Sequence, residues 1–152
     1  MMVKSLKILL IIFGVVFAQS PDKLYQAAQS ALDAGKVSEA ESGFNSTIQM
    51  DPTFAPAYIG LAHTSMRMGD LKKTGSLLKE AIALEEENQS FRDEFERLSE
   101  LNTLMSKGIR SMKNGDADDA FESFRVAYEK FPNYPESVFN MGLVHFRKKR
   151  IY

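Results

Sequence analysis

Residues 35–52 read GKVSEAESGFNSTIQMDP, and residues 115–132 read GDADDAFESFRVAYEKFP. Both stretches place glycine, alanine, phenylalanine and proline at one spacing, Gly-x4-Ala-x3-Phe-x7-Pro. A weaker copy lies between them, with its counterparts at Gly69, Thr74, Leu78 and Glu86. Self-similarity at a fixed period of about 20–50 residues is typical of arrays in which each repeat packs on its neighbours. The chain is therefore predicted to be a repeat array whose function lies on a surface.

The spacing of the repeated glycines is irregular at one place. The step from Gly35 to Gly69 is 34, whereas the step from Gly69 to Gly115 is 46, twelve more than the period. The extra residues, 89–100, begin an apolar stripe at i, i+4, i+7 and i+10, namely Phe91, Phe95, Leu98 and Leu101. Because this is helical spacing, the insertion is predicted to lengthen the following helix by about three turns, roughly 18 Å.

Start and stop signals predict seven helices. The expected N-caps are Ser20, Ser38 in a capping box with Glu41, Asp70 and Asp116. The predicted helices are 21–34, 38–50, 54–68, 71–87, 90–114, 117–130 and 135–148. They group into repeats at about 21–54, 55–88 and 101–134, a half-repeat at 135–149 and the helical insertion 89–100. The expected fold class is all-α, an α-solenoid of about three helix–turn–helix units and a C-terminal capping helix.

The last helix belongs to a fourth, incomplete copy. Gly142 and Lys149 fall one full period after Gly108 and Gly115, so residues 135–149 correspond to the first helix of a pair. Two interpretations stand side by side. The basic stretch 147–150 gives the helix a polar end suited to a terminal cap, or the chain has been cut short.

Residues 1–18 have the pattern of a secretory signal peptide. Lys4 and Lys7 precede an apolar run from Ile8 to Ala18, and the chain then becomes polar. The run is shorter than the roughly 20 residues that span a bilayer as a helix. We expect cleavage after Ala18 and an exported protein, periplasmic or secreted, with residues 19–152 as one repeat domain. The alternative is a retained membrane anchor that displays the repeats on the membrane surface.

Composition excludes several classes of function. Without the two lysines of residues 1–18, the chain has 17 basic and 20 acidic side chains, a net charge of −3. This mild acidity argues against a nucleic-acid partner, which requires a concentrated basic face. The absence of cysteine leaves no disulfide framework, so packing alone holds the fold.

Catalytic and cofactor signals are weak. His63 and His145 are the two histidines, they lie in different repeats, and neither has a carboxylate at i+3 or i+4. The sequence lacks the paired ligands of a metal centre, and residues 69–73 form a helix turn rather than a phosphate loop. No enzyme activity, metal or cofactor is therefore expected.

The chain resembles the tetratricopeptide repeat, a 34-residue helix–turn–helix unit with the pattern W-x2-L-G-x2-Y…A-x3-F…P. The match covers about 21–86 and 101–149. Its first half is carried best by Tyr58-x2-Leu61-Ala62, and small residues recur at one place in every copy: Ala28, Ala62, Gly108 and Gly142. These small side chains are expected to allow close helix contact. No copy has the tryptophan, and Thr74 and Glu86 weaken the second copy.

The resemblance implies a function. First helices of such repeats line a concave groove in which a peptide or helix of another protein binds. The residues at the groove-facing places are Tyr25, Gln29, Leu32, Ile59, His63, Met66, Met105, Ile109, Met112, Phe139, Leu143 and Phe146. Apolar side chains dominate this set, which suits protein binding, although an apolar stripe can also be core. Tyr25, Gln29 and Gly60 do not support a clamp for an acidic C-terminal peptide.

The insertion suggests a rival function. Phe91, Phe95 and Leu98 resemble a short coiled-coil seam, which can pack within the chain or pair with a second subunit. The leading hypothesis is a non-enzymatic adaptor or scaffold in the cell envelope that binds another protein. Self-association through this seam is the alternative.

Overall fold

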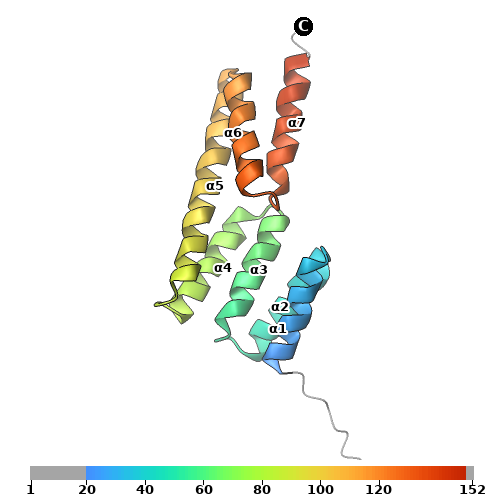
Figure 1. The fold of residues 1–152 in the computed structure, drawn as a ribbon, viewed down its shortest axis with the longest axis vertical. Coiled ribbons are helices and arrows are strands. Elements are labelled where there is room, and N and C mark those ends of the chain that lie inside the picture. Colours follow the sequence, from blue (N-terminus) through green and yellow to red (C-terminus); the bar gives the residue numbers. More distant parts are fainter. Residues whose placement is uncertain (1–19, 150–152) are drawn as a thin grey trace, which may run out of the picture.

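The computed structural model describes residues 20–149, so the predicted signal segment, residues 1–18, lies outside the described residues. The described part contains seven helices and no strand (Figure 1). They are α1 (Pro21–Asp33), α2 (Val37–Met50), α3 (Ala55–Arg67), α4 (Leu71–Leu84), α5 (Gln89–Asn114), α6 (Ala117–Lys130) and α7 (Pro135–Lys149). The all-α prediction is confirmed. None of these helices is long and apolar enough to cross a membrane.

A glycine lies at the turn between the two helices of each pair. Gly35, Gly69 and Gly115 have φ of 75°, 82° and 89°, the left-handed conformation that only glycine adopts without strain. Ser20 caps α1 and Asp70 caps α4 through their side chains, as the sequence predicts. The capping box at Ser38 was wrong, because α2 begins at Val37 after Lys36 with no side-chain cap. The sequence also placed the end of α4 three residues too late.

Phenylalanine rings pack closely on glycines at two helix contacts, one between neighbouring pairs (α2 and α3) and one within a pair (α5 and α6). Phe44 and Phe124 are fully buried. A Cβ added at Gly108 would lie 2.5 Å from a ring carbon of Phe124, and one added at Gly60 would lie 2.3 Å from Phe44. Gly60 and Gly108 are thus places where the backbone of one helix meets an aromatic ring of another.

Helix α5, 26 residues long, packs in two different surroundings. In its N-terminal half, Phe91 and Leu98 are buried against α3 and α4, with Lys79 over the ring of Phe95. In its C-terminal half, Leu101 and Met105 are buried with residues of α6 and α7. The stripe proposed to pair with a second subunit therefore packs within the chain, and the self-association prediction loses its basis.

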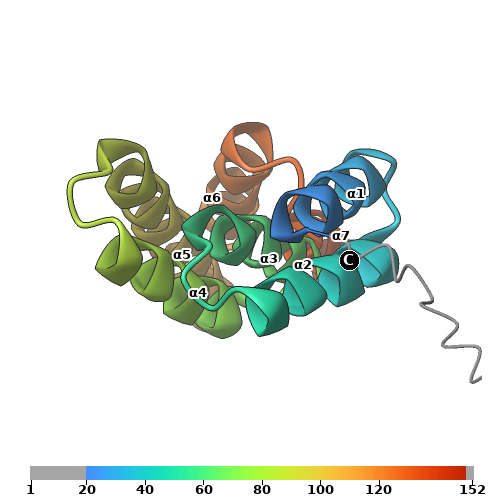
Figure 2. The same ribbon diagram turned by 90° about the horizontal axis from the view of Figure 1, so that it is seen from below.

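The length of α5 divides the array into two tiers. The lower tier contains α1 to α4 and the N-terminal half of α5; the upper tier contains the C-terminal half of α5 with α6 and α7 (Figures 1 and 2). Because α6 and α7 pack on the C-terminal half of α5, the segment between α6 and α7 lies next to the α3–α4 turn. Glu136 of α7 is packed against Gly69, so close that a Cβ there would meet its carboxylate.

Candidate functional site

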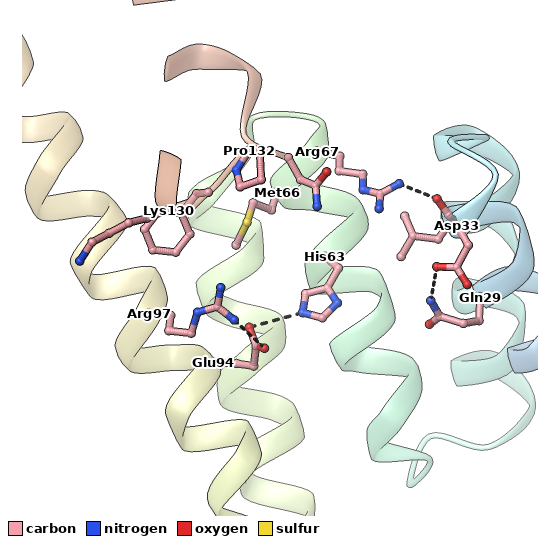
Figure 3. A pocket seen from close by; sticks show the side chains of 12 residues that line it. Gln29, Asp33, His63, Met66, Arg67, Glu94, Arg97, Lys130 and Pro132 are labelled. Carbon is pink, nitrogen blue, oxygen red and sulfur yellow. Dashed lines mark hydrogen bonds and ion pairs between the residues drawn. The ribbon is translucent and has the colours of Figure 1, made fainter. Parts of the chain in front are cut away.

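A cavity of about 240 Å³ lies where the two tiers meet, and we call it the inter-tier pocket (Figure 3). Helices α1, α3 and α5 of the lower tier form one wall. The segment that ends α6 and leads to α7 forms the other. Its twelve lining residues are Gln29, Leu32, Asp33, His63, Met66, Arg67, Glu94, Arg97, Lys130, Phe131, Pro132 and Asn133.

The lower wall follows the repeat period. Three lining residues on successive helices are separated by one period each: Gln29 on α1, His63 on α3 and Arg97 on α5. Leu32 and Met66, one turn further along their helices, have the same separation. Successive first helices therefore present equivalent positions to one surface, and the N-terminal half of α5 supplies the third row.

Ion pairs order this wall. The His63 Nε2 atom lies 3.4 Å from a Glu94 carboxylate oxygen, and Arg97 lies 3.5 Å from the other oxygen. The hydrogen bond with His63 is the main cause that lowers the pKa of Glu94. In α1, the Gln29 amide donates to Asp33 at 3.0 Å. Glu94 is therefore held as a carboxylate between two cationic or donor groups.

The opposite wall is formed by the end of α6 and the residues that lead to α7. Phe131 is buried in the upper-tier core, which fixes the backbone of the segment that follows it. Lys130 pairs with Glu100 of α5, and Arg97 lies over the Phe131 ring at 5.7 Å from its centroid. Pro132 and Asn133, both exposed, complete the rim.

The structure brings together four of the twelve groove residues implied by the sequence. Gln29, Leu32, His63 and Met66 line the inter-tier pocket. Two others from the lower tier, Tyr25 and Ile59, are half-buried and pack against core residues instead. The Tyr25 ring packs on Phe44 and Phe54, with centroids 5.8 and 5.4 Å apart. Ile59 packs beside the buried residues of α4 and α5.

The upper-tier members of the predicted groove do not join this pocket. Met105 is only 6% exposed, and its sulfur accepts a hydrogen bond from the Ser137 hydroxyl, so its assignment to an open groove is corrected. Ile109 is 38% exposed, and Met112 lines a separate cavity near the α5–α6 turn. Phe139 and Phe146 are exposed on α7, and Leu143 is half-buried.

Sequence reasoning missed Glu94, Arg97 and the Lys130–Asn133 rim. The sequence held one signal for Arg97, because it lies one period after His63. A third repeat that begins at residue 101 does not include Arg97. Within residues 20–149 no group of three metal-ligating side chains is positioned to hold an ion.

Three observations now agree on the kind of repeat. Helix pairs follow one another along the chain, a left-handed glycine lies at the turn within each pair, and the buried phenylalanines Phe44 and Phe124 pack on glycines of the facing helices. These are features of the tetratricopeptide repeat, which the sequence resembles. Repeats of this kind generally mediate protein–protein interaction.

Comparison with known proteins gives partial matches. No family model matches the sequence. The photosystem I assembly protein Ycf3 of a Synechococcus strain is 36% identical over 83 residues, which cover 55% of this chain and 43% of that protein. Ycf3 of Prochlorococcus marinus is 34% identical over 68 residues, covering 45% and 39%. The chain therefore matches less than half the length of these curated relatives.

Solved structures with a similar arrangement of helices have low sequence identity. The first TPR of Spaghetti (RPAP3), bound to an HSP90 peptide, aligns with a TM-score of 0.44 at 17% identity, over 86% of this chain and 94% of that one. MamA aligns with a TM-score of 0.44 at 18% identity, over 86% and 70%.

Proposed function

We propose that this protein is a non-enzymatic adaptor of the tetratricopeptide-repeat kind, and that it binds a peptide or helical segment of another protein in the inter-tier pocket. The observation that carries the proposal is the joining of two tiers around one cavity, lined by first-helix residues at the repeat period. Concave surfaces of repeat arrays are the usual binding surfaces of such folds.

The volume and chemistry of the pocket favour a side chain over a whole small molecule. About 240 Å³ is below the roughly 300–1,000 Å³ of pockets that enclose drug-sized ligands. Leu32, Met66 and Phe131 supply apolar surface, while Glu94 and Arg97 are already paired with each other. The ligand that fits is a peptide segment that inserts one apolar side chain and forms hydrogen bonds at the charged rim.

Peptide selection tests the proposal directly. Random peptides displayed on phage would be selected on the full chain, and the affinities of the enriched sequences measured as synthetic peptides. Asn133→Trp fills the pocket from its exposed rim and is expected to weaken binding by about tenfold or more, the loss expected at a central contact. Asn102→Trp, an equally large change on the exposed surface of α5, is the matched control.

Two outcomes would contradict the proposal. One is a failure to enrich any peptide that binds the folded chain. The other is a set of peptides whose affinity is the same for Asn133→Trp, Asn102→Trp and the unaltered protein, since these would bind elsewhere.

The proposed place of action is the cell envelope, in the periplasm or outside the cell. The support is the pattern of residues 1–18, with Lys4 and Lys7 before a short apolar run. Expression in a bacterial host followed by mass measurement of the protein tests this point. A mature chain that begins at Gln19 in the periplasmic fraction supports export with cleavage, and an intact N-terminus in the membrane fraction supports the retained anchor.

A further inference from the structure

The inter-tier pocket is lined by groups that attract aromatic rings. Arg67 and Arg97 bring two guanidinium groups to its lining, and Met66 brings a thioether. Figure 3 shows Met66 and Arg97 pointing toward the same space from α3 and α5. A cation is attracted to the face of an aromatic ring, and a methionine sulfur is attracted most often to its edge. Because an aliphatic side chain offers neither attraction, this lining distinguishes aromatic from aliphatic residues.

One contact of this kind is already present in the pocket wall. The guanidinium carbon of Arg97 lies 5.7 Å from the centroid of the Phe131 ring. Phe131 is buried in the upper-tier core, so its ring holds Arg97 at the pocket. A guanidinium is planar and stacks on aromatic faces. Since the side chain of Arg97 is still 58% exposed, it has surface left for a second ring.

Arg67 is a half-buried cation without a carboxylate partner. Its Nη1 atom donates a hydrogen bond to the Leu32 carbonyl near the end of α1. Among the ion pairs of residues 20–149, none includes Arg67. Attraction between a cation and a ring is stronger where water is excluded. A ring that covers Arg67 therefore gains an interaction for which no carboxylate competes within the described residues.

Charged side chains of a peptide fit this pocket less well. A lysine or arginine would meet three cations of the lining, at Arg67, Arg97 and Lys130. An aspartate or glutamate would have to leave water beside the buried Leu32 and Phe131, which costs free energy. The pocket therefore favours a neutral side chain, and its cations and sulfur favour one with π-electrons.

We propose that the inter-tier pocket selects peptides of another protein by an aromatic residue, whose ring packs on Met66 and Arg97. The cavity of about 240 Å³ has room for a phenyl, phenol or indole ring, since an apolar cavity of about 150 Å³ already holds benzene. This selection rests on the peptide binding proposed above and adds the chemistry by which the pocket recognises the peptide.

A change in the peptide separates the electrons of the ring from its size. The probe is the phage-selected peptide of highest affinity, labelled with fluorescein, and an alanine scan locates its inserted residue. Replacement of that residue by cyclohexylalanine keeps an apolar ring but removes the π-electrons. Fluorescence anisotropy with the full chain is expected to show a loss of affinity of about fivefold or more. A leucine version of the peptide should lose at least as much.

Variants of the protein assign the preference to the pocket. Arg97→Gln keeps a hydrogen-bond donor near Glu94 but has no charge. In this variant the affinity ratio of the aromatic and cyclohexylalanine peptides should fall by about threefold, which a double-mutant cycle measures. Met66→Leu, which removes the sulfur at similar volume, should lower the same ratio. Arg110→Gln, on the exposed surface of α5 outside the pocket, is the matched control and should leave the ratio unchanged.

The methyl group of Met66 reports where the ring lies. Its signal in a proton–carbon NMR spectrum is assigned by its loss in Met66→Leu. The aromatic peptide at saturation should shift this signal through the ring current, and the cyclohexylalanine peptide should shift it much less. Equal shifts with the two peptides would place the ring away from Met66 and overturn the proposed packing.

The remaining outcomes separate aromatic selection from peptide binding itself. If no selected peptide binds the folded chain, both proposals are wrong. If peptides bind in the pocket but keep their affinity with cyclohexylalanine, only aromatic selection is wrong. The same holds if Arg97→Gln changes the affinity ratio no more than Arg110→Gln does. A concentration-dependent dimer in sedimentation that Asn133→Trp dissociates would place a second copy of the chain in the pocket, and would overturn selection of another protein.

Discussion

Gly108 and Gly142 occupy the same place in successive repeats, yet alanine should have opposite effects at the two positions. Both lie inside helices with ordinary helical backbone, so the conformational contribution of the substitution is the same. At Gly108 the new methyl group would lie 2.5 Å from one carbon of the Phe124 ring, and 2.7 and 2.8 Å from two others. At Gly142 it would meet no atom within 4 Å.

Helix propensity and overpacking together determine the sign and the size of the change in the free energy of unfolding. Replacing glycine by alanine inside a helix stabilises by about 0.8–1.0 kcal/mol. Overpacking a tight core costs about 1–3 kcal/mol, and the Phe124 ring, fully buried, has little room to move. Gly142→Ala should therefore raise the free energy of unfolding by up to about 1 kcal/mol, while Gly108→Ala should lower it by about 0–2 kcal/mol. The difference between the variants is about 1–3 kcal/mol, set by the ring contact.

Urea denaturation followed by circular dichroism measures both variants against the unaltered chain. A shift of the midpoint at constant m-value reports stability, and a changed m-value would signal that the terminal helix unfolds separately from the rest. The reasoning is refuted if Gly108→Ala is the more stable of the two. It is also refuted if Gly142→Ala is clearly destabilised, because open space and helix propensity leave no physical cause for that loss.

Three further outcomes are expected. Gly35→Ala adds a Cβ in open space but at a φ of 75°, so urea denaturation should show a loss of about 1–2 kcal/mol from backbone strain alone. His63→Ala should raise the pKa of Glu94, which a carbon-detected NMR titration measures. Because the pKa of Glu94 is lowered in the folded protein, the stability that Glu94 contributes is present above pH 4.5 and is lost as the pH falls below it. Burial, aided by Glu136, raises the pKa of Tyr134 to about 12, so ultraviolet titration should show a late tyrosine, and its contribution to stability should be lost as the pH rises above 10.

The regular parts of this fold could be predicted from the sequence because local rules and period agree. The left-handed glycines at Gly35, Gly69 and Gly115 mark the turns, and the stripe from Phe91 predicts a helix that continues unbroken to Asn114. The Ser38 cap failed because Val37 already joins the helix, which starts after a lysine that offers no side-chain acceptor. Boundaries of this kind depend on a single turn of backbone, which propensity alone does not fix.

The candidate site was only half predictable. Gln29 and His63 follow from the period, but the partner of His63 is Glu94, which lies on the inserted part of α5. Such a pair depends on how α5 stacks on α4, which sequence spacing within one helix does not report. Lys130 and Asn133 reach the pocket because α6 and α7 are displaced along α5 relative to the lower tier. A tertiary displacement of this kind has no local signature.

The twelve-residue insertion also acts as a rotation. At 3.6 residues per turn, twelve residues are three turns and roughly 120° more, whereas eleven would leave only about 20°. Two residues of α5 correspond to His63 of α3: Arg97 lies one period after it, and Ile109 lies one period plus the twelve inserted residues after it. Arg97 and Ile109 are therefore separated by this angle around the helix axis. One turns toward α3, while the other is exposed in the upper tier. A single continuous helix therefore points the two halves of the array in different directions, so that ligands held by the halves would be oriented at an angle fixed by the phase of α5.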